Sequence, residues 1–162
     1  MILSLNKSEK IIIPKESIRF RVIANSDNDN DQLLKRKIVT NLNKNIESLL
    51  TLNNNILSSR ENIKQNIPQF NEVIDRTLNE NNSKETYKIK YGMNYFPKKE
   101  YKGVIYEEGD YESLVVTLGE GKGKNFWCVL FPPLCLLEGE KNKNTKEVEY
   151  KSFIKEVIDK YF

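Results

Sequence analysis

Residue types that can do chemistry gather in residues 119–135, whose sequence is GEGKGKNFWCVLFPPLC. This stretch holds three of the seven glycines, two of the five prolines, the only tryptophan and both cysteines. Glycine loops that bind phosphate need defined spacings, and this one fits neither of the two common patterns. A P-loop requires a glycine where this chain has Lys124, and the third glycine of the dinucleotide fingerprint is misplaced at Gly123. The spacing therefore excludes both nucleotide-binding interpretations.

Two interpretations of the glycine loop remain open. It is either a long hairpin loop that uses glycine for positive φ angles, or an exposed basic loop that contacts an acidic partner through Lys122, Lys124 and Asn125. Phe126 and Trp127 follow at once, and strand alternation lets only one of the two rings face inward. Trp127 is either half-buried core, which we favour, or an exposed anchor for a partner.

The two cysteines, Cys128 and Cys135, lie on either side of a Pro-Pro turn. Their spacing matches no zinc knuckle and no thioredoxin pair. A disulfide would close a ring of about eight residues and stabilise the fold by roughly 2–3 kcal/mol. The alternative is two buried free thiols. The even count and the position around the turn favour the bridge, which requires an oxidising compartment.

A second group of polar side chains lines the outer face and the end of the first predicted strand: Arg19, Arg21, Asn25 and Asp27. Two arginines on one strand face can bind a carboxylate or a phosphate bidentately. More often such arginines pair with acidic residues of the same chain. The acidic residues available for this pairing are Glu107, Glu108 and Asp110.

Asp27, Asp29 and Asp31 have the spacing of the first three ligands of a calcium-binding loop. No glycine follows them, and Ile38 stands where the loop needs glutamate. Capping of the following helix by the Asp and Asn side chains of residues 25–31 is the better interpretation.

Composition limits the classes of function. The chain has 162 residues and no histidine, which removes the commonest general base and zinc ligand and lowers the expectation of an enzyme. A net charge of +3, with basic and acidic residues interspersed, is too small to indicate nucleic-acid binding. No apolar run approaches the roughly 20 residues of a membrane span. We expect no metal and no cofactor.

Hydrophobic periodicity predicts one α/β (α+β) domain, a small mixed sheet with amphipathic helices packed on it. Residues 1–16 are expected to be irregular and residues 17–162 to form the domain. Pro68 is expected to start a new helix, and Ser58 to begin a capping box. The predicted strands are 17–24, 87–91, a short pair around Gly103, 111–118 and 126–131; the predicted helices are 31–50, one from Ser58 to Ile67, one from Pro68 to about 81, and 148–162.

Two motifs, residues 18–27 (IRFRVIANSD) and the stretch 119–135, together resemble the stage II sporulation protein R family of endospore-forming Firmicutes. The resemblance covers roughly residues 17–137. Shorter matches follow the same order along the chain: Asp31-Gln32, Tyr91-Gly92, Phe96-Pro97, Tyr101, Gly103 and Gly109-Asp110-Tyr111-Glu112. Phe126 stands where the family usually has an aromatic residue, often tryptophan.

The resemblance implies a signalling protein. Family members are secreted from the forespore into the space between the forespore and mother-cell membranes. There they activate a mother-cell membrane protease of the aspartic type, stage II sporulation protein GA, which processes the pro-form of sigma factor E. The resemblance implies no catalytic residues. We expect this chain to lack the export segment and to bind its partner through the residues named above, with a hydrolase acting on cell-wall material as the alternative.

Overall fold

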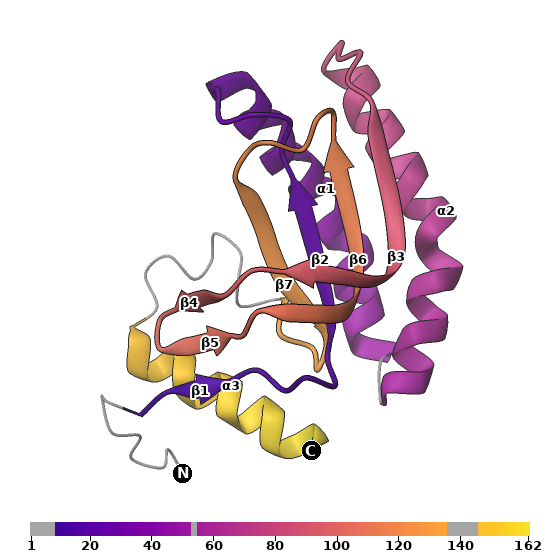
Figure 1. Cartoon of the computed structure of the whole chain (residues 1–162). Helices are drawn as coiled ribbons and strands as arrows, with labels where there is room; N and C mark the ends of the chain where they lie inside the picture. Colours follow the sequence, from indigo (N-terminus) through magenta and orange to yellow (C-terminus); the bar gives the residue numbers. More distant parts are fainter. Residues whose placement is uncertain (1–8, 53–54, 136–145) are drawn as a thin grey trace.

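The computed structural model describes residues 9–52, 55–135 and 146–162. The helices are α1 (Asp29–Leu52), α2 (Ile56–Glu80) and α3 (Glu147–Tyr161). The strands are β1 (Ile11–Ile12), β2 (Ile18–Ile23), β3 (Tyr87–Phe96), β4 (Lys99–Tyr101), β5 (Val104–Tyr106), β6 (Gly109–Leu118) and β7 (Asn125–Phe131). This arrangement confirms the predicted small α+β fold (Figure 1).

The larger sheet has four strands in the order β3-β6-β2-β7. Strand β6 runs parallel to β2, whereas β7 is antiparallel to β2 and β3 is antiparallel to β6. A smaller sheet in the order β1-β5-β4 contains the predicted pair around Gly103. Since β2 lies between β6 and β7, the segment that joins β6 to β7 must cross the end of β2.

One face of the larger sheet packs against α1 and α2. Alternate residues of β2, namely Ile18, Phe20 and Val22, are buried there, as the period-2 pattern predicts. Ile38 and Leu42 of α1 contribute the predicted helical stripe to the same core. Figure 1 shows both helices on one side of the sheet, with α3 near the small sheet at the other end.

A second core lies on the opposite face of the sheet. It joins Val115, Trp127 and Val129 of the larger sheet to residues of the small sheet and of α3, including Tyr106 and Tyr150. Ile13 is also buried here, and Ile11–Ile12 pairs with β5. The expectation that residues 1–16 are wholly irregular is therefore wrong at its C-terminal end.

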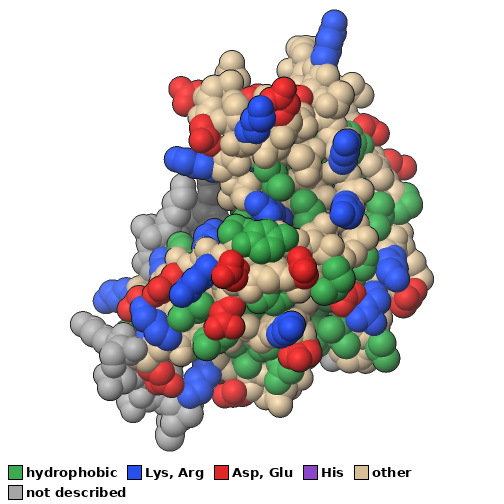
Figure 2. Space-filling view, viewed as in Figure 1, with side chains coloured by type: hydrophobic (Ala, Val, Ile, Leu, Met, Phe, Trp, Pro, Cys, Tyr) green, Lys and Arg blue, Asp and Glu red, His purple; other side chains and the backbone are tan. Residues whose placement is uncertain are grey.

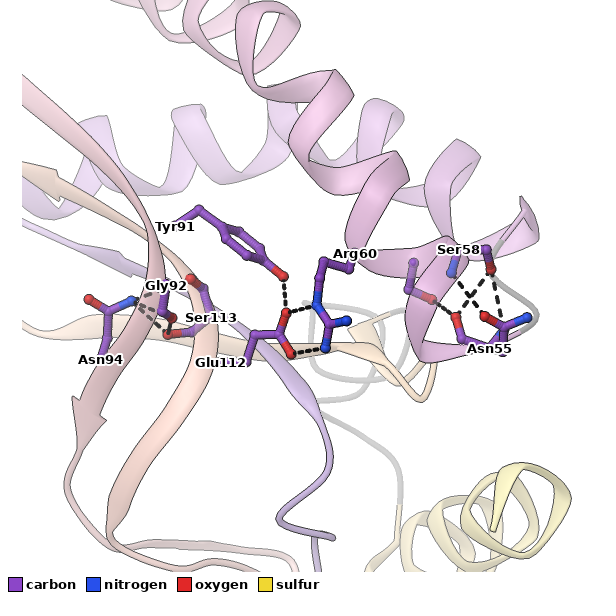
Figure 3. A network of polar contacts seen from close by, with 9 residues as sticks. Asn55, Ser58, Arg60, Tyr91, Gly92, Asn94, Glu112 and Ser113 are labelled. Carbon is purple, nitrogen blue, oxygen red and sulfur yellow. Dashed lines mark hydrogen bonds and ion pairs between the residues drawn. The ribbon is translucent and has the colours of Figure 1, made fainter.

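Helix α2 differs from the sequence prediction at two points. Its N-cap is Asn55, whose Oδ1 accepts a hydrogen bond from the Ser58 backbone N–H at 2.9 Å, so that Ser58 is the third helical residue and not the cap (Figure 3). The helix also continues through Pro68 without a new start. Ile63 and Phe70, on either side of Pro68, belong to the same core, and their packing outweighs the backbone hydrogen bond that proline cannot donate.

An ion pair fastens α2 to the sheet. Glu112 Oε2 accepts from Arg60 Nε at 2.5 Å and from the Tyr91 hydroxyl at 2.5 Å, and Glu112 Oε1 accepts from Arg60 Nη2 at 2.9 Å (Figure 3). The hydrogen bond from Arg60 is the main reason that the pKa of Glu112 is lowered.

Strand β3 extends past the predicted end at Tyr91, through Gly92, and pairs with β6 as far as Phe96.

Candidate interaction site

The glycine loop, residues 119–124, is attached to the end of β2. The backbone N–H groups of Lys122 and Gly123 donate to the carbonyl oxygens of Asn25 at 3.0 Å and Ala24 at 2.9 Å. At the start of the loop, the Gly119 N–H donates to the Thr86 carbonyl oxygen at 2.7 Å. The loop is therefore a connection that crosses β2 and not the hairpin loop that was one of the two interpretations.

Two side chains from the polar turn after β2 hold the same loop. Asn25 Oδ1 accepts from the Glu120 N–H at 2.8 Å, and Asp27 Oδ1 accepts from the Lys124 N–H at 2.7 Å. The structure thus brings together two sequence motifs whose contacting residues are 95 and 97 positions apart. Asn25 and Asp27, both named as candidate partner-binding residues, position the loop with their side-chain oxygens.

The turn after β2 is in turn fixed by the start of α1. Asp31 Oδ2 accepts from Asn25 Nδ2 at 2.8 Å and from the Ser26 hydroxyl at 2.6 Å, and these bonds, Ser26 first, lower the pKa of Asp31. Asn28 Oδ1 accepts from the Asp31 N–H at 2.8 Å, which is the predicted capping role. The described residues contain no group of three acidic or cysteine side chains that could hold a metal ion.

Close packing requires glycine at two positions of the loop. Gly119 has a φ of +54°, and a Cβ there would lie 2.3 Å from Asn25 Oδ1. A Cβ at Gly123 would lie 2.2 Å from the Ser26 carbonyl oxygen, which belongs to the backbone and cannot rotate away. The positive φ at Gly119 and the close backbone approach at Gly123 account for glycine at these two positions.

The lysines of the loop point to solvent. Lys122 and Lys124 are exposed, and Lys122 Nζ lies 3.1 Å from Glu120 Oε2. Below the loop, the buried Lys35 of α1 donates from Nζ to the Lys124 carbonyl oxygen at 3.2 Å. Burial is the main cause that lowers the pKa of Lys35, followed by the charge of a neighbouring arginine. In the sequence Lys35 is only a basic residue next to the apolar Leu34 of the predicted helix 31–50, which gives no sign of this contact.

Arg21 and Asn125 lie beside the loop and contact one another. The Asn125 amide is oriented with its oxygen toward Arg21, where it accepts from Nη2 at 2.8 Å and from Nε at 3.1 Å, while its nitrogen donates to the Gly123 carbonyl oxygen at 3.0 Å. Arg21 Nη1 donates to the Tyr95 carbonyl oxygen at 3.3 Å. Of the three acidic residues available to pair with the arginines, Glu108 instead accepts from the Tyr95 hydroxyl at 3.0 Å.

Arg19 does not lie on an outer, solvated face, so this expectation is wrong. Only 1% of its surface is exposed, and its guanidinium carbon lies 3.6 Å from the centroid of the Tyr111 ring and 5.6 Å from that of Phe96. Alternation along β2 does direct Arg19 away from α1 and α2, but the second core covers that position. Trp127 is 8% exposed in the same core, which agrees with the favoured interpretation and not with an exposed anchor.

The predicted disulfide between Cys128 and Cys135 is present in the structure. It joins the middle of β7 to the residue just after the Pro-Pro turn, with a Cα–Cα distance of 4.9 Å, and both residues are buried. The Leu134 N–H donates to the Val129 carbonyl oxygen at 3.1 Å and closes the turn from the other side. The bridge therefore fixes how the chain leaves the strand that follows the glycine loop.

Comparison with known sequences identifies the family. A sequence model described as stage II sporulation protein R matches residues 14–141. The chain belongs to the stage II sporulation protein R family. Stage II sporulation protein R of Bacillus subtilis (strain 168) is 35% identical over 155 residues, which cover 96% of this chain and 69% of that protein. No solved structure matches the chain.

Membership of the stage II sporulation protein R family gives the chain a role in sporulation, and the relative's name refers to no enzymatic activity. The matched range includes the turn after β2, the glycine loop and both cysteines, so the whole candidate site lies within the family region. Among the described residues, no helix is both long enough and apolar enough to cross a membrane.

Proposed function

We propose that this chain is a sporulation signalling protein that activates a membrane protease by binding to it. The protease is the mother-cell enzyme stage II sporulation protein GA, which then processes the pro-form of sigma factor E. The site of action is the space between the forespore and mother-cell membranes. The proposal rests on the family match over residues 14–141 and on the fixed glycine loop, which presents two exposed lysines.

The geometry supports a binding role for the loop in a specific way. Asn25, Asp27 and the glycine positions hold the backbone of residues 119–124 in one shape. A surface that is already ordered loses little conformational entropy when a partner binds. Lys122 and Lys124 are then available for charged contacts, which steer association and set specificity.

A thiol hydrolase is disfavoured by one observation. Both cysteines of the chain are joined in the disulfide, so neither supplies a free thiolate as a nucleophile. The thiol form of the hydrolase alternative therefore lacks its nucleophile.

The test is a reconstituted processing assay. Cells that make the membrane protease and the pro-form of sigma factor E, and that export this chain, are expected to accumulate the shortened sigma factor. The double variant Lys122→Gln with Lys124→Gln should reduce processing by about fivefold or more while the unfolding midpoint stays unchanged. A matched control, Lys44→Gln with Arg76→Gln, removes two exposed charges from α1 and α2 and should process normally.

Unchanged processing with the loop lysines replaced would remove the loop from the activating surface. No processing at all with the exported wild-type chain would contradict the proposed function itself.

A further inference from the structure

One part of the larger sheet remains uncovered on the side of the second core. The register places Lys88, Thr117, Ile23 and Asn125 in one row across the four strands. In Figure 1 the upper parts of β2 and β6 face the viewer, and no described helix or strand lies in front of them.

The next row across the same four strands is formed by Lys90, Val115, Arg21 and Trp127. We call these eight residues the open sheet face; Val115 and Trp127 are each only 8% exposed and belong to the second core, so the groups that a partner can reach are those of the other six. Together they form a surface about four strands, or roughly 15 Å, wide.

The open sheet face carries positive charge and no negative charge. Lys88 and Lys90 are exposed, Arg21 is half-buried, and none of the eight residues is acidic. Lys99 adds a further cation, with Nζ 4.8 Å from the centroid of the Trp127 ring. In Figure 2 blue and green side chains occupy this part of the surface, and red ones gather above and below it.

Arg21 is the most informative residue of the face. Within the described part of the chain its guanidinium donates only to neutral oxygens, those of Tyr95 and Asn125. Burial lowers the pKa of Arg21, and no carboxylate opposes that effect. A half-buried cation with neutral partners gains most from an arriving carboxylate, because the charge-assisted hydrogen bond replaces hydration that has already been lost.

We propose that the open sheet face binds an acidic, extended segment of the partner protein, with one carboxylate on Arg21 and another on Lys88 or Lys90. Strands β3 and β2 are separated by β6, so the two cationic groups lie about 10 Å apart. In an extended chain the carboxylates that share one face lie about 7 Å apart at every second residue and about 14 Å apart at every fourth, and the flexible lysine side chains can span the difference. The inference rests on the proposed function in naming the partner as the protease that the chain activates.

The test measures peptide binding to the purified chain, with its disulfide intact, by fluorescence anisotropy. The probe is a fluorescein-labelled peptide of eight residues in which every second residue is glutamate, and the control peptide has glutamine at those positions. The glutamate peptide is expected to bind at low ionic strength and to weaken as salt is added. The glutamine peptide is expected to bind at least about tenfold more weakly.

Variants locate the binding. Arg21→Gln should weaken the glutamate peptide about tenfold to a hundredfold, because it removes a half-buried charge-assisted hydrogen bond. Lys88→Gln with Lys90→Gln should weaken it about threefold to tenfold, and Lys44→Gln with Arg76→Gln should leave it unchanged. Because Lys88 and Lys90 are exposed, the double variant keeps the inference testable even if Arg21→Gln fails to fold.

Three results would overturn the inference. The first is that the two peptides bind equally well, or that the face variants bind the glutamate peptide as tightly as the wild type does. The second is tighter, Arg21-dependent binding of an eight-nucleotide single-stranded DNA than of the peptide. The third is a dimer in sedimentation equilibrium that Arg21→Gln dissolves, since the occupant would then be a second copy. The peptide assay contains no protease, so its failure is separate from a failure of the processing assay.

Discussion

Replacing Asn25 by aspartate tests how the glycine loop is held. In the native protein Asn25 Oδ1 accepts from the Glu120 N–H, and Asn25 Nδ2 donates to Asp31 Oδ2 at 2.8 Å. Asn25→Asp keeps the shape of the side chain and the acceptor for the loop. The substitution replaces the Nδ2 donor by an oxygen, so that the carboxylates of residues 25 and 31 face each other in place of the hydrogen bond.

The expected cost combines two effects. A hydrogen bond to a charged group contributes about 1.5–3 kcal/mol. Repulsion between two charges at about 4 Å adds roughly 1 kcal/mol in water and about 4 kcal/mol near a protein surface. Asn25 and Asp31 are both half-exposed, which favours the lower part of each range. Asn25→Asp should therefore lower the free energy of unfolding by about 2–4 kcal/mol at pH 7.

The pH dependence of the free energy of unfolding tests the sign of this effect separately. The new pair of like charges raises the pKa of one carboxyl in the folded state above its unfolded value. The penalty is then full above that raised pKa and is relieved as the pH falls through it. In the native protein the pKa of Asp31 is lowered instead, so its stabilising contribution is lost in acid. Both effects make the difference between variant and wild type shrink below about pH 5.

Urea unfolding, followed by the fluorescence of Trp127 between pH 4 and pH 8, measures these differences. The control is the exchanged pair Asn25→Asp with Asp31→Asn, which restores one donor facing one acceptor and should recover at least about half of the lost stability. An unchanged urea midpoint for Asn25→Asp, or an exchanged pair no more stable than the single variant, would refute this account of the loop.

Three further predictions concern other parts of the molecule. Glu112→Gln weakens the ion pair with Arg60 and should lower the free energy of unfolding by about 1–2 kcal/mol at pH 7. Since the pKa of Glu112 is lowered from 4.5, this loss should fade in urea titrations as the pH falls below that value, and a constant loss would contradict the assignment. Cys128→Ser with Cys135→Ser should lower the free energy of unfolding by about 2–3 kcal/mol in the same titration. An unchanged urea midpoint would show that the disulfide does not stabilise the fold. Gly123→Ala should lower the melting temperature by several degrees, because its Cβ would meet the Ser26 carbonyl oxygen; an unchanged melting temperature would contradict the close packing.

Local patterns in the sequence predicted most of the secondary structure, because each element shows its buried face in its own residues. The period-2 alternation of Ile18, Phe20 and Val22 predicts β2, and the stripe that includes Ile38 and Leu42 predicts α1. The continuous apolar run at 114–116 predicts the interior position of β6, which does lie between β3 and β2.

Contacts between distant segments account for the failures. Alternation along β2 places Arg19 and Phe20 on opposite faces of the sheet, but it does not reveal that a second core covers the face on which Arg19 lies. The rings around Arg19 come from Phe96, Tyr106 and Tyr111, which are more than seventy residues away along the chain. Strand order is equally non-local, so no local pattern distinguishes the glycine loop, which crosses β2, from a hairpin loop.

The candidate site was predicted in its parts and not in its arrangement. Asn25, Asp27 and the loop lysines were each named from the sequence, yet their assembly depends on hydrogen bonds that no local pattern encodes. In the sequence, the alternation of Lys88 and Lys90 with apolar residues indicates only a strand with one solvated face. Their alignment with Arg21 follows from the register of three strands.

The most direct test of the central claim is a crosslink from the glycine loop to the protease. A photoreactive residue at position 122 of the exported chain is expected to form a covalent adduct with the membrane protease in sporulating cells. The same residue at position 44 of α1, on the far side of the sheet, should form none. Adducts from position 44 alone, or from position 122 only to other proteins, would contradict the claim that this surface binds the protease.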